Sequence, residues 1–196
     1  MFERFTQASR EAVIAAQRFA SQTLSREVRE EHLMLGLLDG DDATSALVLD
    51  EIGVTAQARA ALVDDLMNLS RRAGIGTADA EALRDIGIDV DEVLGRMEEL
   101  TDPPTPGIHP ARRGPFGRRK MRKEPGRRHV PFSTGTKRTL ERTLREALDL
   151  RDNHIDTEHM LLALLSRGGV VAEALGEHGV TYVEVRRAIA TRNPSG

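Results

Sequence analysis

Two Glu-His pairs stand 127 positions apart, Glu31-His32 and Glu158-His159, and their side chains come closest to forming a chemical site. An imidazole beside a carboxylate could ligate a metal ion or move a proton. Each His, however, lies in an apolar stretch with helical spacing, where a core or capping histidine is the more common role. His154 is five residues from His159, which does not put both on one helical face. We therefore expect no metal site.

The rest of the sequence contains no motif that indicates catalysis. The chain has no Cys, which excludes a disulfide framework, a thiolate metal site and a cysteine nucleophile. It also has no Gly-Lys dipeptide, so the glycine-rich loop that cradles nucleotide phosphates is absent. Ser, His and Asp residues are scattered, with no nucleophile elbow. We expect a protein with no catalytic residues and no cofactor.

Composition points to a small helical protein. The 196 residues are long enough for one ordinary domain, or for two small repeats that share a core. Aromatic residues make up only 3%, so Ala and Leu must fill that core. No apolar run approaches the length that spans a bilayer, and the first residues do not form a signal sequence. With the absence of Cys, this predicts a cytoplasmic protein that does not bind membranes.

The sequence contains an internal duplication. A shift of 127 positions places Phe5-Thr6 on Phe132-Ser133 and one Glu-His pair on the other. After one residue is dropped in the following loop, Gly53 and Thr55 fall on Gly179 and Thr181. Because the register holds over most of each copy, the pattern indicates two repeats of one structural unit. We place them at residues 1–70 and 129–191, followed by a tail at 192–196.

Each repeat is predicted to hold four helices, so the expected fold is all-α. The first helix follows a hydroxyl N-cap, Thr6 or Ser133, and the second is short and apolar. The third helix ends at a glycine suited to a left-handed C-cap, Gly53 or Gly179. Thr181 and Glu184 have the spacing of a capping box before the fourth helix. No stretch alternates with period two for long enough to predict a sheet.

An insertion of two parts separates the repeats. Residues 71–100 are predicted to form short helices broken at Gly87, and residues 101–128 to form a disordered loop. Residues 101–130 hold nine Lys or Arg against two Asp or Glu, with one aromatic residue, Phe116. Such a segment could bind nucleic acid phosphates or stay a solvated linker against the acidic first half. Salt-dependent DNA binding lost on deletion of 110–128 would favour the first alternative.

Several stretches resemble one known family. Met1-Phe-Glu-Arg-Phe-Thr, His129-Val-Pro-Phe-Ser, Leu144-Arg-Glu-Ala-Leu and Ile155-Asp-Thr-Glu-His-Met-Leu-Leu-Ala-Leu-Leu resemble the N-terminal domain of Clp (Hsp100) ATPases of the ClpC type. The likeness covers roughly residues 1–70 and 129–191 and occurs twice at matching positions. It implies two four-helix repeats related by pseudo-twofold symmetry, here as a stand-alone chain without the ATPase modules.

The resemblance also implies two ligand sites that read phosphoarginine. Glu31 and Glu158 would take the guanidinium, with Thr6 and Ser133 near the phosphate, because carboxylates accept guanidinium forks and helix N-termini favour anions. The same residue types also stabilise any helix start. Repeat one departs from the family at Arg29, which could occupy the carboxylate itself, so repeat two is the better candidate, although Asp156 replaces a family Gly there.

A second implied site is a hydrophobic groove between the repeats, which in the family binds adaptor segments and cyclic peptide antibiotics. Phe2, Phe132, Lys137 and Glu141 occupy the matching positions. An aromatic pair beside a Lys and a Glu offers apolar anchoring and orientation. The two Phe side chains could equally just cover the core.

These observations favour a non-catalytic protein- or peptide-binding module, an adaptor-like or competing regulator of Clp-mediated proteolysis. Its expected partners are Clp ATPase or protease components, client proteins or degron peptides, and arginine-phosphorylated proteins or cyclic peptides. The alternative is a nucleic-acid-associated protein that binds through the Arg-rich segment. An enzyme is the least supported class, since no motif predicts turnover.

Overall fold

The computed structural model describes residues 2–40, 43–72, 75, 77–90, 92–93, 96 and 130–192. The first repeat holds a short 3-10 helix, η1 (Phe2–Arg4), and α1 (Gln7–Gln22), α2 (Glu30–Leu38), α3 (Thr44–Glu51) and α4 (Ala56–Arg71). The second holds α7 (Thr134–Asp149), α8 (Thr157–Arg167), α9 (Val170–Glu177) and α10 (Tyr182–Arg192). The described residues contain no strand beyond two isolated bridges, so the all-α prediction is confirmed.

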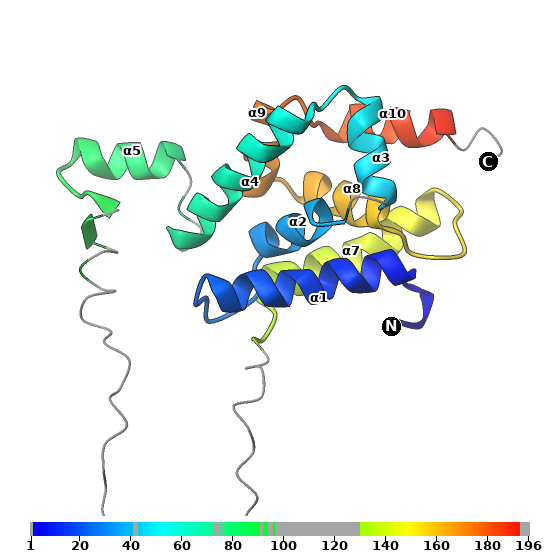
Figure 1. The fold of residues 1–196 in the computed structure, drawn as a ribbon, viewed down its shortest axis with the longest axis horizontal. Helices are drawn as coiled ribbons and strands as arrows, with labels where there is room; N and C mark the ends of the chain where they lie inside the picture. The colour runs from blue at the N-terminus through cyan, green and yellow to red at the C-terminus, as the bar shows by residue number, and fades with distance from the viewer. Residues whose placement is uncertain are drawn as a thin grey trace, which may run out of the picture. The chain divides into compact units, whose positions relative to one another are not determined.

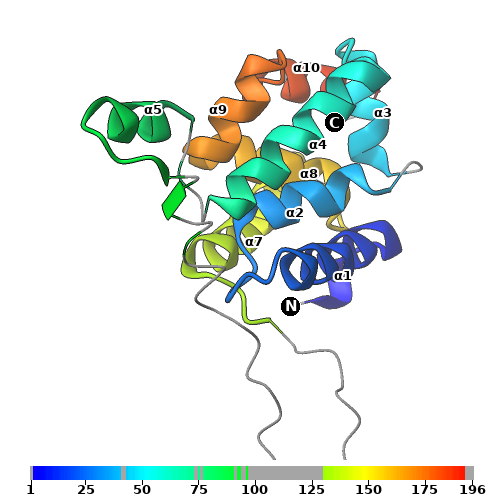
Figure 2. The same ribbon diagram turned by 60° about the vertical axis from the view of Figure 1, so that its left-hand side comes forward.

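The repeats pack as one unit with α2 and α8 in the middle. Both views show α1 and α7 on one side of this central pair and α3, α4, α9 and α10 on the other (Figures 1 and 2). The central helices are almost entirely buried, and Leu33, Met34, Leu161 and Leu162 have no exposed surface. Leu, Val and Ala make up most of the core cluster among the described residues, in keeping with the low aromatic content.

Helix ends form where the sequence places them. Thr6 caps α1 by accepting a 3.2 Å hydrogen bond from the Ser9 amide, and Ser133 caps α7 through the Thr136 amide at 3.0 Å. Gly53 has φ +84°, the left-handed conformation expected after α3. Thr181 accepts from the Glu184 amide, but Glu184 accepts from the Thr181 hydroxyl at 2.9 Å, which differs from the reciprocal backbone bond of a capping box.

Reciprocal backbone pairing joins the two repeats. Phe5, just before α1, forms a parallel bridge with Ile155, just before α8, and Phe132, before α7, pairs in the same way with Val28, before α2. The bonds match: the Thr6 amide donates to the Ile155 carbonyl at 2.9 Å, and the Ser133 amide donates to the Val28 carbonyl at 2.9 Å. When each of two copies makes the same backbone hydrogen bonds to the other, the copies are related by twofold symmetry. The predicted pseudo-twofold relation is therefore observed.

The described part of the insertion, which begins at residue 77, belongs to a second unit of the chain. It contains α5 (Thr77–Asp85), followed by a turn at Gly87 with φ +87°. Beyond that turn only residues 88–90, 92–93 and 96 are described, so most of the second predicted short helix lies outside the described part. The basic stretch 101–128 lies wholly outside it, and its predicted disorder stays a prediction. None of the described helices is long and apolar enough to cross a membrane.

Candidate functional site

The strongest candidate group lies at the start of α8. Glu158, in the first turn, is 5% exposed and makes no hydrogen bond or ion pair with any described residue. Burial, and after it the negative charge of Asp156, raises the pKa of Glu158 to about 7, with Arg192 acting in the opposite direction. A nearly buried carboxylate without a partner is energetically unfavourable, and a cationic ligand would relieve it.

Asp156, the N-cap of α8, connects three helix starts. Its Oδ1 accepts from the Thr157 amide at 2.7 Å and from the Thr6 hydroxyl at 3.1 Å, at the start of α1. Its Oδ2 accepts from the Thr44 hydroxyl at 2.8 Å, in the first turn of α3. The structure thus brings Thr6 of the first repeat to the Glu158 end of the second. Spacing alone could not reveal this, because the contact crosses 150 residues.

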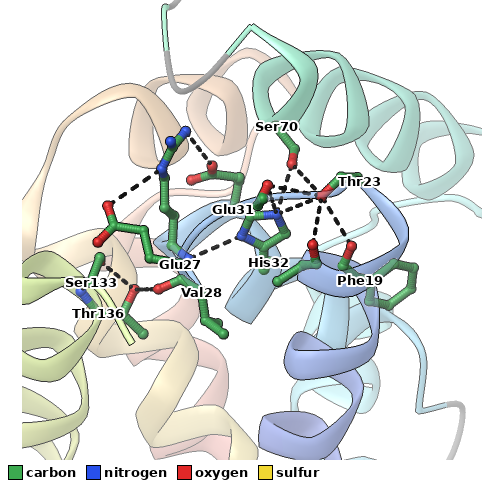
Figure 3. A network of polar contacts seen from close by, with 12 residues as sticks. Phe19, Thr23, Glu27, Val28, Glu31, His32, Ser70, Ser133 and Thr136 are labelled. Carbon is green, nitrogen blue, oxygen red and sulfur yellow. Dashed lines mark hydrogen bonds and ion pairs between the residues drawn. The ribbon is translucent and has the colours of Figure 1, made fainter. Parts of the chain in front are cut away.

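The matching place in the first repeat already holds a cation of its own. Arg29 is the N-cap residue of α2, and its Nη1 lies 3.7 Å from Oε1 of Glu31. Neither atom has a hydrogen-bond partner among the described residues, and Glu31 is 3% exposed. Nε of Arg29 also lies 3.7 Å from Oε1 of Glu27, and both glutamates are labelled in Figure 3. Burial raises the pKa of Glu31, while its own backbone amide and then Arg29 act to lower it.

Ser133 lies beside this first-repeat place. Its hydroxyl contacts that of Thr136 at 3.0 Å, and Thr136 donates to the Val28 carbonyl at 2.9 Å (Figure 3). Glu30 fills the adjoining space: its Oε1 accepts from the Thr139 hydroxyl and, at 2.9 Å, from Nε of Arg167. Each candidate place is therefore built from both repeats, one combining α1 with α8 and the other α7 with α2.

The two histidines cap their helices. Nδ1 of His32 accepts from the Arg29 amide at 3.0 Å, and Nδ1 of His159 accepts from the Asp156 amide at 2.9 Å. The proton of each neutral ring is therefore on Nε2. In His32 this nitrogen faces the hydroxyls of Ser70 at 2.7 Å and Thr23 at 3.1 Å (Figure 3). The capping role expected from the sequence is confirmed.

One cluster with metal-ligand residue types occurs among the described residues. Ligand atoms of Asp152, Glu158 and His159 lie within 4.8 Å of one another. Nε2 of His159 donates to Oδ2 of Asp152 at 2.9 Å, and Nδ1 is held by the Asp156 amide, so neither ring nitrogen has a lone pair free. Burial lowers the pKa of His159, partly offset by its bond to Asp152. The arrangement suits a neutral capping histidine better than a metal ligand.

A cavity of about 200 Å³ lies beside α7. Its walls are Phe5, Leu140, Leu144 and Ile155, with Glu3 and Arg4 at its edge. Phe132, Lys137 and Glu141, the predicted groove residues whose side chains are described, are not part of these walls. Lys137 and Glu141 are exposed one turn apart on α7, and Phe132 is half-buried against the core. The Phe2 side chain lies outside the described part.

A family model describing the Clp repeat (R) N-terminal domain matches residues 4–77 and 116–192, which together make up most of the chain. The chain belongs to this Clp N-terminal domain family. The second match begins inside the basic stretch, 13 positions before the predicted start of repeat two at residue 129.

Curated relatives of this Clp N-terminal domain are longer proteins. An uncharacterized protein of Mycobacterium tuberculosis is 29% identical over 164 residues, which cover 84% of this chain and 44% of that protein. A protein of Guillardia theta named ATP-dependent Clp protease ATP-binding subunit ClpA homolog is 27% identical over 190 residues, 96% of this chain and 17% of that protein. The chain thus spans less than half the length of these relatives.

Solved structures share the fold. The N-terminal domain of the chaperone ClpD from Arabidopsis thaliana has a TM-score of 0.52 and 19% identity, covering 100% of this chain and 97% of that one. A chain from a study of a malarial protein secretion system has a TM-score of 0.57 and 17% identity, covering 97% and 94%. At this identity the likeness concerns the fold alone.

Sequence reasoning on this Clp N-terminal domain missed one functional feature and anticipated another. It noted Asp156 as a departure from the family but not its bonds to Thr6 and Thr44. The possibility that Arg29 occupies the Glu31 carboxylate is observed, because the two charges lie 3.7 Å apart. In the sequence, both the Asp156 hydrogen bonds and the Arg29–Glu31 ion pair were indicated only by a charged residue at an N-cap position where the family has glycine.

Proposed function

We propose that this chain is a non-catalytic protein-docking domain that binds arginine-bearing segments of client proteins at Glu158. The observation that carries the proposal is the Glu158 carboxylate itself, nearly buried in the first turn of α8 and unpartnered among the described residues. A guanidinium supplies positive charge and forked donors that match a carboxylate. The anchoring group is an arginine side chain, free or phosphorylated.

Family membership supports a role beside the Clp machinery, and the cytoplasmic setting is part of the proposal. Relatives include a Clp protease ATP-binding subunit homolog, and the chain shares the fold of a Clp-associated chaperone domain. The domain acts in the cytoplasm with Clp ATPase or protease components as an adaptor-like or competing regulator. As an adaptor it hands bound segments to the unfoldase, and as a competitor it withholds them.

The cavity beside α7 serves as a second contact for the same segments. Its apolar walls, Phe5, Leu140, Leu144 and Ile155, suit an apolar side chain or the apolar face of a cyclic peptide. Lys137 and Glu141 are exposed on the same helix and offer charges of both signs for orientation. A docked segment would thus be held by one charged anchor and one apolar anchor.

Calorimetric titration with a short peptide carrying one arginine, and with the same peptide carrying phosphoarginine, tests the site. We expect saturable binding of at least one peptide that is lost in Glu158→Gln. Glu31→Gln serves as the matched control, because Glu31 already faces Arg29, and it should bind like wild type. Absence of binding by both peptides, or equal binding by Glu158→Gln, would contradict the proposal.

The Clp role needs a separate measurement. The rate at which a Clp unfoldase and its protease degrade an arginine-bearing client is compared with and without this protein. A faster rate identifies an adaptor and a slower rate a competitor, and Glu158→Gln should remove either effect. An unchanged rate at saturating protein would exclude both roles.

A further inference from the structure

The N-cap positions of α2 and α8 correspond in the duplication, yet they carry opposite charges. Arg29 begins α2 and Asp156 begins α8, 127 positions later. Arg29 is turned towards a carboxylate, whereas Asp156 is turned towards hydrogen-bond donors. Each side chain therefore fills a different half of its site: the cation half in the first repeat and the anion half in the second.

Asp156 uses the donors that an incoming anion would need. The Thr157 amide, the Thr6 hydroxyl and the Thr44 hydroxyl all donate to its carboxylate, at 2.7, 3.1 and 2.8 Å. These donors come from the starts of three helices, where the helix dipoles favour negative charge. The chain has thus placed its own anion there, and a phosphoryl group would have to displace it or lie against it.

The remaining charges around Glu158 favour a cation. Glu158 is 5% exposed and lacks a partner among the described residues, and Asp152 and Asp156 add negative charge close by. The nearby Arg192 acts to lower the pKa of Glu158 but lies beyond ion-pair distance from it, and its guanidinium donates to the Thr44 carbonyl at 3.3 Å. The pKa of Glu158 moves upward partly because of Asp156, which records the same surplus of negative charge.

We propose that Asp156 is the specificity-determining residue of the α8 site and makes it select an unmodified arginine side chain over a phosphorylated one. The proposal rests on the docking function at Glu158 and names the ligand form that this site takes. A phosphoryl group adds negative charge and acceptor oxygens where a carboxylate already holds the donors. Glu158 stays available to the guanidinium.

Paired titrations test this selectivity on the full chain. Two peptides identical except for arginine or phosphoarginine are titrated into wild type, Asp156→Asn and Glu173→Gln. Asparagine keeps the shape and capping ability of aspartate but removes its charge. Glu173→Gln changes the net charge equally at an exposed position on α9. Circular dichroism of each variant verifies folding.

Wild type and Glu173→Gln should bind the arginine peptide about tenfold tighter than the phosphoarginine peptide, the scale of one well-placed charge contact. Asp156→Asn should reduce that ratio several-fold, mainly by improving phosphoarginine binding. Equal or tighter phosphoarginine binding by wild type would overturn the selectivity while leaving the docking function intact. An unchanged ratio in Asp156→Asn would remove Asp156 as its cause, and no binding of either peptide would overturn both proposals.

Discussion

At the scale of single residues, the candidate site holds a carboxylate, that of Glu158, whose burial is unfavourable and which has no partner among the described residues. Glu158 and Glu31 are equivalent in the duplication and similarly buried, but among the described residues only Glu31 has a cation within ion-pair distance, whereas Arg192 acts on Glu158 from farther away. The free energy that a buried carboxylate loses when it leaves water is recovered only by a partner. In the second repeat no ion pair offsets the desolvation free energy of Glu158, as expected of a residue that binds a cationic ligand.

The pH dependence of binding follows from the raised pKa of Glu158. A guanidinium stays charged across the whole range, so affinity tracks the ionised fraction of Glu158, whose pKa is about 7 in the free protein. The charged groups that set this value are Asp156, Arg192, Asp152 and His154. We expect affinity for the arginine peptide to fall about tenfold from pH 8 to pH 6. Calorimetry in buffers of equal ionic strength measures it, and a flat profile would contradict the assignment.

The same shift makes Glu158 a liability for stability. In the unfolded chain its pKa is near 4.5, and in the folded protein it is about 7, so the folded state binds more protons between these values. The contribution of Glu158 to stability is therefore present at low pH and lost as pH rises through 7. Because solvent screens part of the charge, Glu158→Gln should stabilise the protein at pH 8 by on the order of 2 kcal/mol, less than the full pKa shift would imply. Urea unfolding at pH 5 and pH 8 checks this, and a gain at pH 5 as large as that at pH 8 would contradict it.

At the scale of elements, α1 and α2 cross closely because of a glycine. A β-carbon at Gly36 would lie 2.2 Å from the Ala12 carbonyl oxygen, so the helices would have to separate. Gly36→Ala should lower the free energy of unfolding by about 2–3 kcal/mol. Gly176→Ala, in a helix with no neighbour within 4 Å of the added carbon, should raise it by about 0.5–1 kcal/mol. Urea unfolding of both variants tests the pair, and a neutral Gly36→Ala would contradict the close crossing.

Helix starts and stops were predictable because their causes are local. Thr6, Ser133 and Gly53 act within one turn of their own helix, so sequence neighbours suffice. Leu24 and Arg151, equivalent in the duplication, have φ +53° and +61° although neither is glycine, and nothing in their types announces it. The bonds of Asp156 depend on how the repeats meet, which spacing does not encode. The helix ends could therefore be predicted from the sequence, whereas the contacts between repeats that assemble the site could not.

At the scale of the whole molecule, the repeats depend on each other. The bridges before α1, α2, α7 and α8 all pair one repeat with the other, and α3 and α4 of the first pack against α8 and α9 of the second. His178, the C-cap of α9, also contacts Asp65 on α4 at 2.8 Å. A part of the core of each repeat is thus completed by its counterpart.

A split chain tests this dependence. Residues 130–196 alone should show weak helicity and no cooperative thermal transition, because their bridge partners and half of their packing are absent. Adding residues 1–76 should restore helical signal in a one-to-one complex. Circular dichroism with titration of one fragment into the other measures both. A sharp transition for residues 130–196 alone would show that the second repeat folds independently.

The reciprocal bridges also allow a comparison with a dimer of two identical repeats. A chain with a single repeat could satisfy the same backbone groups only by pairing with an identical copy, the segment before the first helix of each subunit bonding to the segment before the second helix of the other. The backbone pairing is therefore the one that a homodimer of single repeats would make. In such a homodimer, any residue at the N-cap of the second helix would appear at both places. Within one chain the two places are independent, which permits arginine at one and aspartate at the other.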